Sequence, residues 1–369
     1  MNVLSPPTND FLASKGRVAT LGMFIIDHHA LRDESGKEIM TDDESIGGGG
    51  VFAMTAARMF LPPTQCGLLV DRGDDFPDTF TEILEGFGKE MIWFRPRKGK
   101  TTRALNIYSG RKIGEGHQSF KYLSPQLNLL PHDLILPPSP FGVSNLPEYI
   151  HVVCRTDRAK LVSQEMDDIK LNGSGEGQRR GVGWNANLVW EPMPSSCIPE
   201  ELDNMIDLAP SFKVFSPNLL EIQSILSMTP RSTPQLTDAE EAAQSFYHLL
   251  ANRYERSMIP AIIVRAGELG AYTLSSTWQG WIPPYWNEMN QDKVIDVTGG
   301  GNSFLGGLCA GLLISQGDMR TASLYASTAA SFSIEQRGLP RLTQSEGKER
   351  WNDDDVWRRL RELSGRVQT

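Results

Sequence analysis

Long apolar runs and closely spaced cysteines are both missing from this chain. The longest apolar run, residues 304–314, is too short to span a bilayer, and residues 1–20 contain no apolar segment of the kind found in signal peptides. The four cysteines lie far apart, without the spacing of metal ligands or redox pairs. We therefore expect a cytoplasmic protein with reduced core thiols and no contact with a membrane.

An excess of positive charge is missing too. The chain has 36 Lys and Arg residues against 45 Asp and Glu residues, so that its net charge is -9. Proteins that bind nucleic acids normally carry a basic surface. We therefore expect a small-molecule substrate and no nucleic-acid partner. The 369 residues suffice for one large domain with a small appendage.

A glycine turn is the most informative stretch that the sequence does contain. Residues 296–308 read DVTGGGNSFLGGL, after the end of a buried strand and before an apolar run at helical spacing. Without Cβ atoms, Gly299, Gly300 and Gly301 let backbone N–H groups converge at the positive end of the following helix. The turn therefore predicts an anion site, although a tight turn that only packs a helix onto a sheet would explain the same glycines.

Buried strands alternate with helical patterns along the rest of the chain. The clearest strands are Val18–Leu21, Cys66–Val70, Tyr149–Cys154, Leu188–Trp190 and Ala261–Val264. Such alternation predicts a mainly parallel sheet that helices cover on both faces.

The glycine turn resembles the second signature of the ribokinase-like (PfkB) family of sugar and nucleoside kinases. The family's final Asp, its general base, is here Asn302, and a carboxamide can orient a hydroxyl group but has no useful basicity. In this feature, a glycine run that ends in Asn, the chain resembles a fungal branch of the family. The positions in step with the signature are Asp296, Thr298, Gly299, Gly301, Phe304, Gly306 and Gly307.

The N-terminal part resembles the substrate-binding region of the same family. Asp27 follows Gly22 at the spacing of an Asp that binds substrate hydroxyl groups, and Gly47 and Gly48 match a glycine pair that opens a helix. The family's sugar-binding Asn is missing, since Val51 or Phe52 stands in its place. A loop Asp that caps a turn, and a glycine loop that feeds a core helix, would explain the same residues.

Two further motifs resemble the family's nucleotide site. Asn218 and Glu221 match a Pro-Asn-x-x-Glu motif that faces the phosphates and their hydrated Mg2+, although ordinary helix capping uses the same spacing. Gly267 and Gly270 match a Thr-x-Gly-x-x-Gly turn that wraps ATP.

At two more positions the resemblance assigns nucleotide contacts. Arg265 replaces the Thr of the ATP turn and could pair with phosphate oxygens. Ser327 falls where the family places a residue near the adenine.

The resemblance covers residues 18–340 and implies an α/β fold: a ribokinase-like three-layer α/β/α sandwich with a mainly parallel central sheet and a small β lid. We expect an N-terminal extension at 1–17, the α/β domain at 18–345 and a C-terminal helix at 346–369. Lid elements are expected near 28–46 and 91–125, including strands at 91–94 and 104–108 around a basic stretch. The family also implies a possible homodimer through the lid.

The resemblance implies an ATP-dependent phosphotransferase that acts on a hydroxyl group of a sugar, nucleoside or related metabolite, with an anion hole at Gly299–Gly301. Its cofactors would be ATP and Mg2+, with Glu221 holding Mg2+ through water. Asp296 and Thr298 would frame a monovalent-cation loop for K+. Asp27 is the nearest carboxylate that could replace the missing base.

Two alternatives stay open. A catalytically silent protein could keep the scaffold to bind a nucleotide or metabolite and to recognise a partner, as the Asn at position 302 favours. The pocket could also host a different reaction on a bulky natural product.

Overall fold

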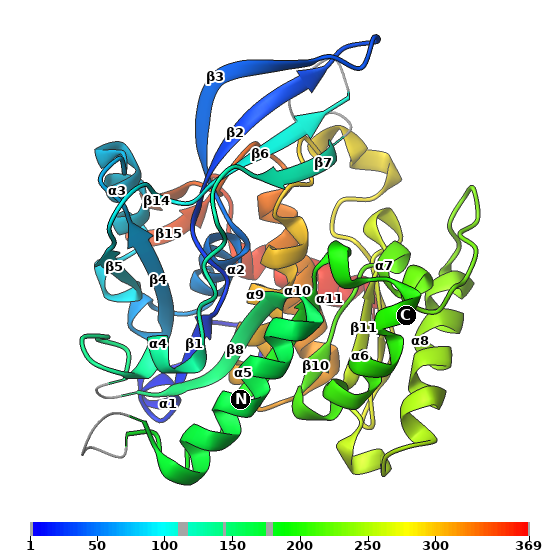
Figure 1. Ribbon diagram of the computed structural model, residues 1–369. Helices are drawn as coiled ribbons and strands as arrows, with labels where there is room; N and C mark the ends of the chain where they lie inside the picture. Colours follow the sequence, from blue (N-terminus) through cyan, green and yellow to red (C-terminus); the bar gives the residue numbers. More distant parts are fainter. Residues whose placement is uncertain (1–2, 110–116, 143–144, 175–179, 368–369) are drawn as a thin grey trace.

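The computed structural model describes residues 3–109, 117–142, 145–174 and 180–367. Figure 1 shows one large sheet with helices on both faces and a smaller sheet that projects from the body at the top of the view. The predicted α/β sandwich with a mainly parallel central sheet and a small lid is confirmed.

The large sheet has nine strands in the order β13-β12-β11-β10-β9-β8-β1-β4-β5. Its neighbours run parallel from β11 to β5, and β12 and β13 add an antiparallel edge. The strands are β1 (Arg17–Thr20), β4 (Cys66–Arg72), β5 (Ile92–Pro96), β8 (Pro147–Cys154), β9 (Asn187–Pro192), β10 (Val214–Phe215), β11 (Ala261–Arg265), β12 (Ala271–Leu274) and β13 (Gln279–Ile282).

Helices form a layer on each face of this sheet. The first layer contains α1 (Asn9–Ala13), α2 (Gly49–Arg58), α3 (Asp78–Glu85), α9 (Gly300–Ser315), α10 (Met319–Ser333) and α11 (Val356–Val367). The second contains α4 (Pro131–Ile135), α5 (Thr156–Asn172), α6 (Leu202–Leu208), α7 (Leu219–Ile225) and α8 (Leu236–Ala251).

Alternating strand residues create two separate cores. Val18 packs with the first helix layer and Ala19 with the second, and Val214 and Phe215 divide in the same way. Side chains point to opposite faces at successive positions of a strand, so a strand that is apolar at every position is covered on both sides. This is why the buried strands of the sequence read as continuous apolar runs.

The lid is a four-stranded sheet in the order β3-β2-β6-β7. The hairpins β2–β3 and β6–β7 are antiparallel, and β2 pairs with β6 in parallel. The strands are β2 (Ile25–Arg32), β3 (Glu38–Gly47), β6 (Arg103–Tyr108) and β7 (His117–Tyr122). Residues 110–116 of the expected lid range lie outside the described residues.

The prediction of a lid strand at 91–94 is wrong. This segment belongs to β5, which pairs in parallel with β4 at the edge of the large sheet. An ion pair joins β5 to β4, because the Nε of Arg95 on β5 lies 2.7 Å from a carboxylate oxygen of Asp71 on β4. Of the two extended segments that flank the basic stretch, only the second enters the lid.

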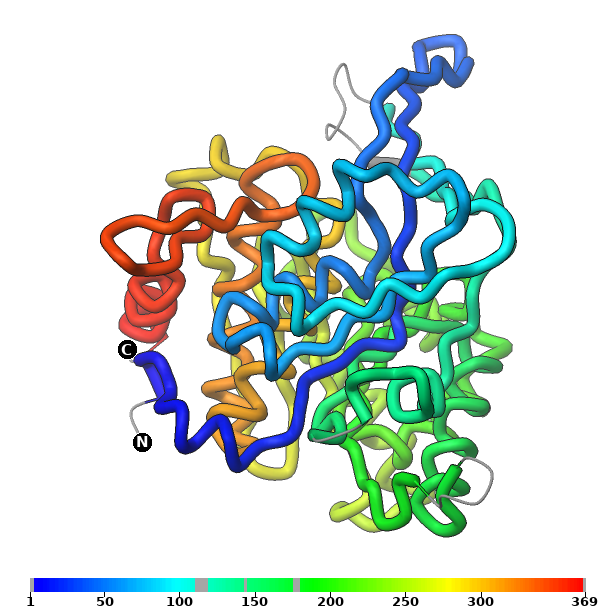
Figure 2. Tube along the Cα trace, turned by 90° about the vertical axis from the view of Figure 1, so that its left-hand side faces the viewer, coloured from blue at the N-terminus to red at the C-terminus, as the bar shows by residue number. Residues whose placement is uncertain are grey.

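The expected C-terminal helix is present, but it occupies only part of 346–369. A hairpin of β14 (Leu342–Ser345) and β15 (Lys348–Trp351) precedes α11. Asn352 and Asp353 then adopt positive φ angles of 48° and 62°, which no right-handed helix accommodates. The helix therefore begins only at Val356. Figure 2 shows this end of the chain beside its beginning, where Arg361 donates a hydrogen bond to the carbonyl oxygen of Leu4 at 3.4 Å.

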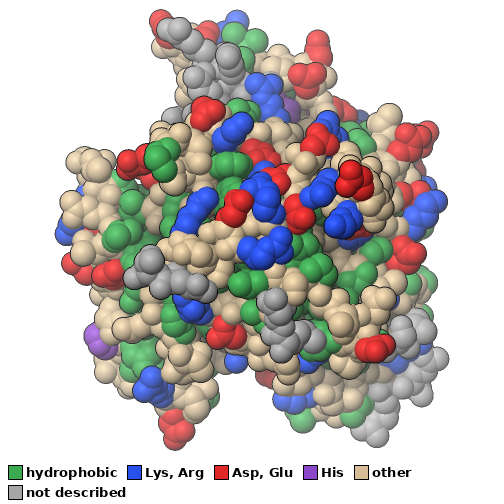
Figure 3. Space-filling model, turned by 180° about the vertical axis from the view of Figure 1, so that it is seen from behind, with side chains coloured by type: hydrophobic (Ala, Val, Ile, Leu, Met, Phe, Trp, Pro, Cys, Tyr) green, Lys and Arg blue, Asp and Glu red, His purple; other side chains and the backbone are tan. Residues whose placement is uncertain are grey.

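The surface mixes charges of both signs. On the face shown in Figure 3, basic and acidic side chains are interspersed. Within the described part of the chain, the helices are too short or too polar to cross a membrane.

Close packing against α9 fixes the position of the first helix layer. A Cβ atom on Gly306 would overlap the carbonyl oxygen of Ala53 in α2, and one on Gly307 would overlap Ala329 in α10. The glycines therefore allow the backbones of three helices to approach one another. Because α9 is buried almost all round, its sequence is apolar at nearly every position.

We predict that Gly306→Ala lowers the free energy of unfolding by at least about 2 kcal/mol, because the added methyl group meets backbone that cannot turn aside. Urea unfolding followed by circular dichroism measures the change. Gly365→Ala in α11 is the matched control, because open space surrounds its added methyl group, and it should leave stability equal or slightly higher. Equal midpoints for the two variants would contradict this account of the packing.

Candidate active site

The glycine turn ahead of α9 presents free amides. Gly299 has a φ of +77°, in the left-handed region, and the ring of Phe52 packs where its Cβ atom would stand. The amide of Gly300 donates to Val297 O at 3.1 Å, and that of Ser303 donates to Gly299 O at 2.8 Å. The other first-turn donors, on Gly301 and Asn302, have no acceptor inside the helix and lie at its positive end.

A cavity of about 750 Å³ opens beside this turn. Most of the residues that were predicted to contact a nucleotide line this cavity, although they come from distant parts of the chain. The Ser327 hydroxyl faces it but donates to Pro283 O at 2.9 Å. The predicted residues in its lining are Arg265, Gly267, Gly270, Gly300, Gly301 and Ser327.

Aromatic and apolar side chains complete the wall of the large cavity, and except for Phe304 they are not positions in step with a sequence motif. Tyr285, Trp286, Val297 and Phe304 all line it. Residues 283–286, which read PPYW, follow β13 without any pattern that marks a ligand site. Such a mixture of an apolar wall and a few polar groups is typical of sites for small molecules.

Arg265 stands at the polar end of this cavity. It is the last residue of β11, and its guanidinium reaches over the glycine turn, where a Cβ on Gly301 would overlap it. Its Nη1 lies 2.9 Å from Glu191 Oε1, and its Nη2 lies 3.6 Å from Glu221 Oε2. The carboxyl ends of the parallel strands β9 and β11 bring these groups together, as is usual for ligand sites in such sheets.

Asn218 and Glu221 form the capping box that the sequence left open as an alternative. Asn218 Oδ1 accepts from the amide of Glu221 at 2.8 Å, and Glu221 Oε2 accepts from the amide of Asn218 at 2.7 Å. Both residues also adjoin Arg265, which pairs with Asn218 in a β-bridge. Burial raises the pKa of Glu221, although the charge of Arg265 opposes the shift.

His151 and Glu191 extend this network into the interior. His151 is fully buried in β8, with its Nε2 3.4 Å from Glu191 Oε2 and its Nδ1 3.0 Å from the Thr20 hydroxyl. Burial alone would raise the pKa of Glu191, but Arg265 and His151 outweigh it and hold this pKa below its usual value. The sequence analysis assigned neither Glu191 nor His151 to the site.

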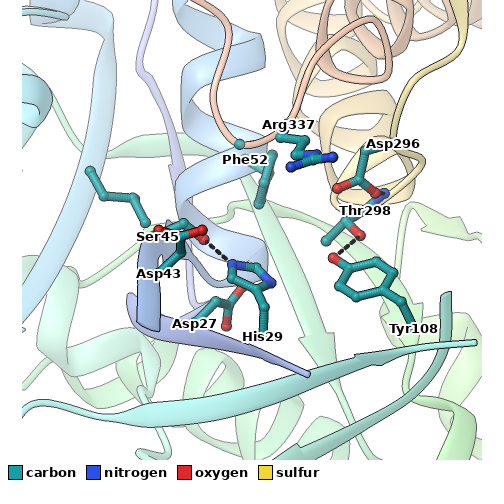
Figure 4. A pocket seen from close by; sticks show the side chains of 11 residues that line it. Asp27, His29, Asp43, Ser45, Phe52, Tyr108, Asp296, Thr298 and Arg337 are labelled. Carbon is teal, nitrogen blue, oxygen red and sulfur yellow. Dashed lines mark hydrogen bonds between the residues drawn. The ribbon is translucent and has the colours of Figure 1, made fainter. Parts of the chain in front are cut away.

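A second cavity of about 150 Å³ lies between the lid and the body. Figure 4 shows its side chains converging from the lid strands and from the turn before α9, while Phe52 of α2 forms an apolar part of its wall. The His29 ring and the Ser45 hydroxyl are joined by a hydrogen bond of 2.8 Å. The polar lining residues are Asp27, His29, Asp43, Ser45, Tyr108, Asp296, Thr298 and Arg337.

Asp27 is the buried acid of the small cavity. Burial raises its pKa to about 7, a hydrogen bond from Asn106 opposes this, and the nearby charge of Asp296 adds to it. Its Oδ1 atom is buried and has no hydrogen-bond partner among the described residues. The backbone of Gly47 packs against the carboxylate so closely that a Cβ would overlap it.

Gly47 and Gly48 were predicted to contact substrate, but they lie behind the small cavity and pack against residues of β2 and the segment before it. Gly48 has a φ of +95°, and a Cβ there would overlap Met23 O. Neither glycine is among the lining residues of the two cavities. Their role in the structure is to let the backbone pass close to Asp27 at the start of α2.

Asn302 occupies the position of the family's base but lines neither cavity. Its side chain lies against Gly49, whose Cβ would overlap the carboxamide oxygen. This oxygen is buried and has no hydrogen-bond partner in the described part of the chain. The acids that line the small cavity are instead Asp27, Asp43 and Asp296.

Asp296 and Thr298, predicted to frame a cation loop, line the small cavity. Asp296 Oδ1 accepts from the amide of Thr298 at 2.9 Å, and the Thr298 hydroxyl lies 3.4 Å from the hydroxyl of Tyr108 on β6. These contacts connect the turn to the lid. The K+ site stays a prediction.

We predict that Asp27 makes stability fall as pH rises. Between about pH 4 and 7 the folded protein keeps a proton that the unfolded chain has released. Asp27→Asn removes this penalty, so its stability relative to wild type should increase by about 3–4 kcal/mol from pH 4 to pH 7. Urea unfolding at each pH measures the difference, with Asp74→Asn at an exposed site as control. A difference that stays constant over this range would refute the assignment.

Comparisons with known proteins agree with this architecture. Residues 191–344 match the model of the pfkB family carbohydrate kinases. The chain is 29% identical to Protein MAK32 of Saccharomyces cerevisiae over 348 residues, which cover 90% of this chain and 88% of that protein. It is 28% identical to an uncharacterized protein of Schizosaccharomyces pombe over 371 residues, covering 96% and 94% of the two chains.

Among solved structures, the ribokinase of Cryptococcus neoformans in complex with ADP has a TM-score of 0.60 at 18% identity, with coverage of 96% of this chain and 100% of that one. This likeness shows the fold. The expected resemblance to a fungal branch is confirmed by the two relatives, and the fold supports a function of the sugar-kinase type. Residues 191–344 thus resemble the pfkB family carbohydrate kinases, and the chain adopts the ribokinase-like fold.

Proposed function

We propose that this protein is an ATP-dependent phosphotransferase that acts on a hydroxyl group of a small molecule such as a sugar or nucleoside. One observation carries the proposal. The turn at residues 296–301 contributes to both cavities, with Gly300 and Gly301 in the large one and Asp296 and Thr298 in the small one. A nucleotide and an acceptor bound in these cavities would meet at the turn.

The large cavity fits a nucleotide. Its apolar wall suits a base, and its polar end offers the amide of Gly301 together with the guanidinium of Arg265. Amides at a helix N-terminus and a planar guanidinium are both good partners for phosphate oxygens. When bound, ATP would supply the phosphoryl group, and the related Cryptococcus neoformans ribokinase was solved with ADP.

The small cavity suits a hydroxyl-bearing acceptor. Its hydroxyl, imidazole and carboxylate groups can both donate and accept hydrogen bonds, and its size admits only a small molecule. Asp27, whose pKa lies at about 7, is partly ionised at neutral pH and is suited to take the proton of the reacting hydroxyl group. Asp27 would thereby replace the base that the substitution at position 302 removes.

A catalytically silent nucleotide-binding protein is the second candidate. The carboxamide at Asn302 favours it, and so does the ion pair between Arg265 and Glu191, which already engages the guanidinium at the phosphate end. In that case ATP would bind and no acceptor would be phosphorylated. A dependence on K+ and a homodimer through the lid stay predictions under either function.

Calorimetry with MgATP, combined with a turnover screen over sugars and nucleosides, tests the proposal. We expect micromolar to millimolar binding and turnover of at least one acceptor. Asp27→Asn should lower kcat about 10²- to 10⁴-fold and leave ATP binding intact, because the general base acts only in the transfer step. Asp74→Asn is the control for a change of charge outside the site.

Each outcome distinguishes the two candidates. If ATP binds and turnover occurs only in Asn302→Asp, the protein is the silent binder. If ATP does not bind to a folded protein, both candidates fail.

A further inference from the structure

Arg265 lies between the two carboxylates that surround the phosphate end of the large cavity. Its Nη1 is 2.9 Å from Glu191, its Nη2 is 3.6 Å from Glu221, and the same Nη2 donates to Ser216 O at 3.0 Å. The side chains of Arg265, Glu191 and Glu221 are 12%, 11% and 9% exposed. The positively charged guanidinium of Arg265 is thus largely buried and is held by Glu191, Glu221 and the carbonyl oxygen of Ser216.

A Mg2+ ion held by Glu221 does not fit this arrangement. Mg2+ needs oxygen ligands around it in near-octahedral geometry, usually one or two carboxylates with waters and phosphates. Both available carboxylates face the positively charged guanidinium of Arg265, and a dication between them would meet this charge directly. Throughout the described ranges, no group of three or more His, Cys, Asp and Glu side chains is positioned to hold a metal ion.

The guanidinium is also well placed for phosphate. It lies over the backbone of Gly301, beside the amides at the start of α9, and it lines the cavity. Its Nε atom is buried and has no hydrogen-bond partner among the described residues. The group therefore keeps donor capacity beyond its bonds to Glu191 and Ser216.

The pairing with Glu191 orients Arg265 for this role. Glu191 is itself held from behind by the buried ring of His151 at 3.4 Å, so one edge of the guanidinium is fixed. Glu221, at the longer distance, is the weaker partner, and its amide-bonded oxygen is shared with the capping box. A phosphate would replace Glu221 as the partner of the Arg265 Nη2 atom.

We propose that Arg265 supplies the cation of the phosphate site, so that nucleotide phosphates bind to this protein without a Mg2+ ion held by its side chains. The inference rests on the proposed binding of a nucleotide in the large cavity. It assigns Arg265 as the residue that distinguishes this site from a carboxylate-held metal site.

Calorimetry of the full chain with ATP tests the proposal directly. We expect the Kd for ATP in EDTA to lie within about threefold of the Kd in excess Mg2+, because no side chain of the protein would bind the metal ion. Arg265→Thr should weaken binding in EDTA about 10- to 100-fold, because charge-assisted hydrogen bonds are lost. Arg256→Thr, at an exposed site with one bond to Ser276 O, is the matched control.

The Glu221→Gln variant should fold like the wild type, because Gln can replace Glu in a capping box. Removing the competing carboxylate should tighten ATP binding about 2- to 5-fold, with or without Mg2+. If Glu221 instead held Mg2+, the same variant would weaken binding in Mg2+ alone. Arg265→Lys keeps the charge and should retain binding in EDTA better than Arg265→Thr, and circular dichroism checks that both variants fold.

The outcomes separate the two proposals. Binding to wild type only when Mg2+ is present overturns the role of Arg265 and leaves the nucleotide site standing. No binding of ATP under either condition overturns the nucleotide site itself. Equal binding in EDTA by wild type and a folded Arg265→Thr also refutes the inference.

Discussion

The close approach of α9 to its neighbours is the constraint on which the site depends. Glycines at 306 and 307 bring α2 and α10 against the body of this helix, and glycines at 299–301 keep its first turn bare. Because the helix sits so deep, its N-terminus opens on cavities rather than on solvent. The same absence of side chains thus allows close packing along the helix and leaves the proposed phosphate site open at its end.

The layered sheet could be predicted because its evidence is local. Continuous apolar strands alternate with helical patterns, and the two cores follow from the period of a strand. The segment at 91–94 shows the limit of this reasoning: its residues read as a strand, but nothing in them reveals that β4 is the partner. The polar hairpin at 342–351 was missed because its pairing depends on a tight turn and on one buried residue, Trp351.

The site was partly predictable for the same reason. Glycine turns and the capping pair carry short-range signals: Gly267 and Gly270 line the large cavity, and Glu221 completes the capping box. The contact between Arg265 and Glu191 joins residues that are far apart in the chain, and His151 is hidden within an apolar strand. Such groups become visible only when the carboxyl ends of neighbouring strands are placed side by side.

In the proposed phosphotransferase, the parallel pairing of β2 and β6 limits how the preference for an acceptor can change. Asp27 and His29 are carried by β2 and Tyr108 by β6, and the ladder between these strands fixes their spacing. A shift of the lid therefore displaces acid, imidazole and phenol together. Gradual adaptation to a new acceptor is easier at Arg337, because this residue does not belong to the strand ladder that carries Asp27.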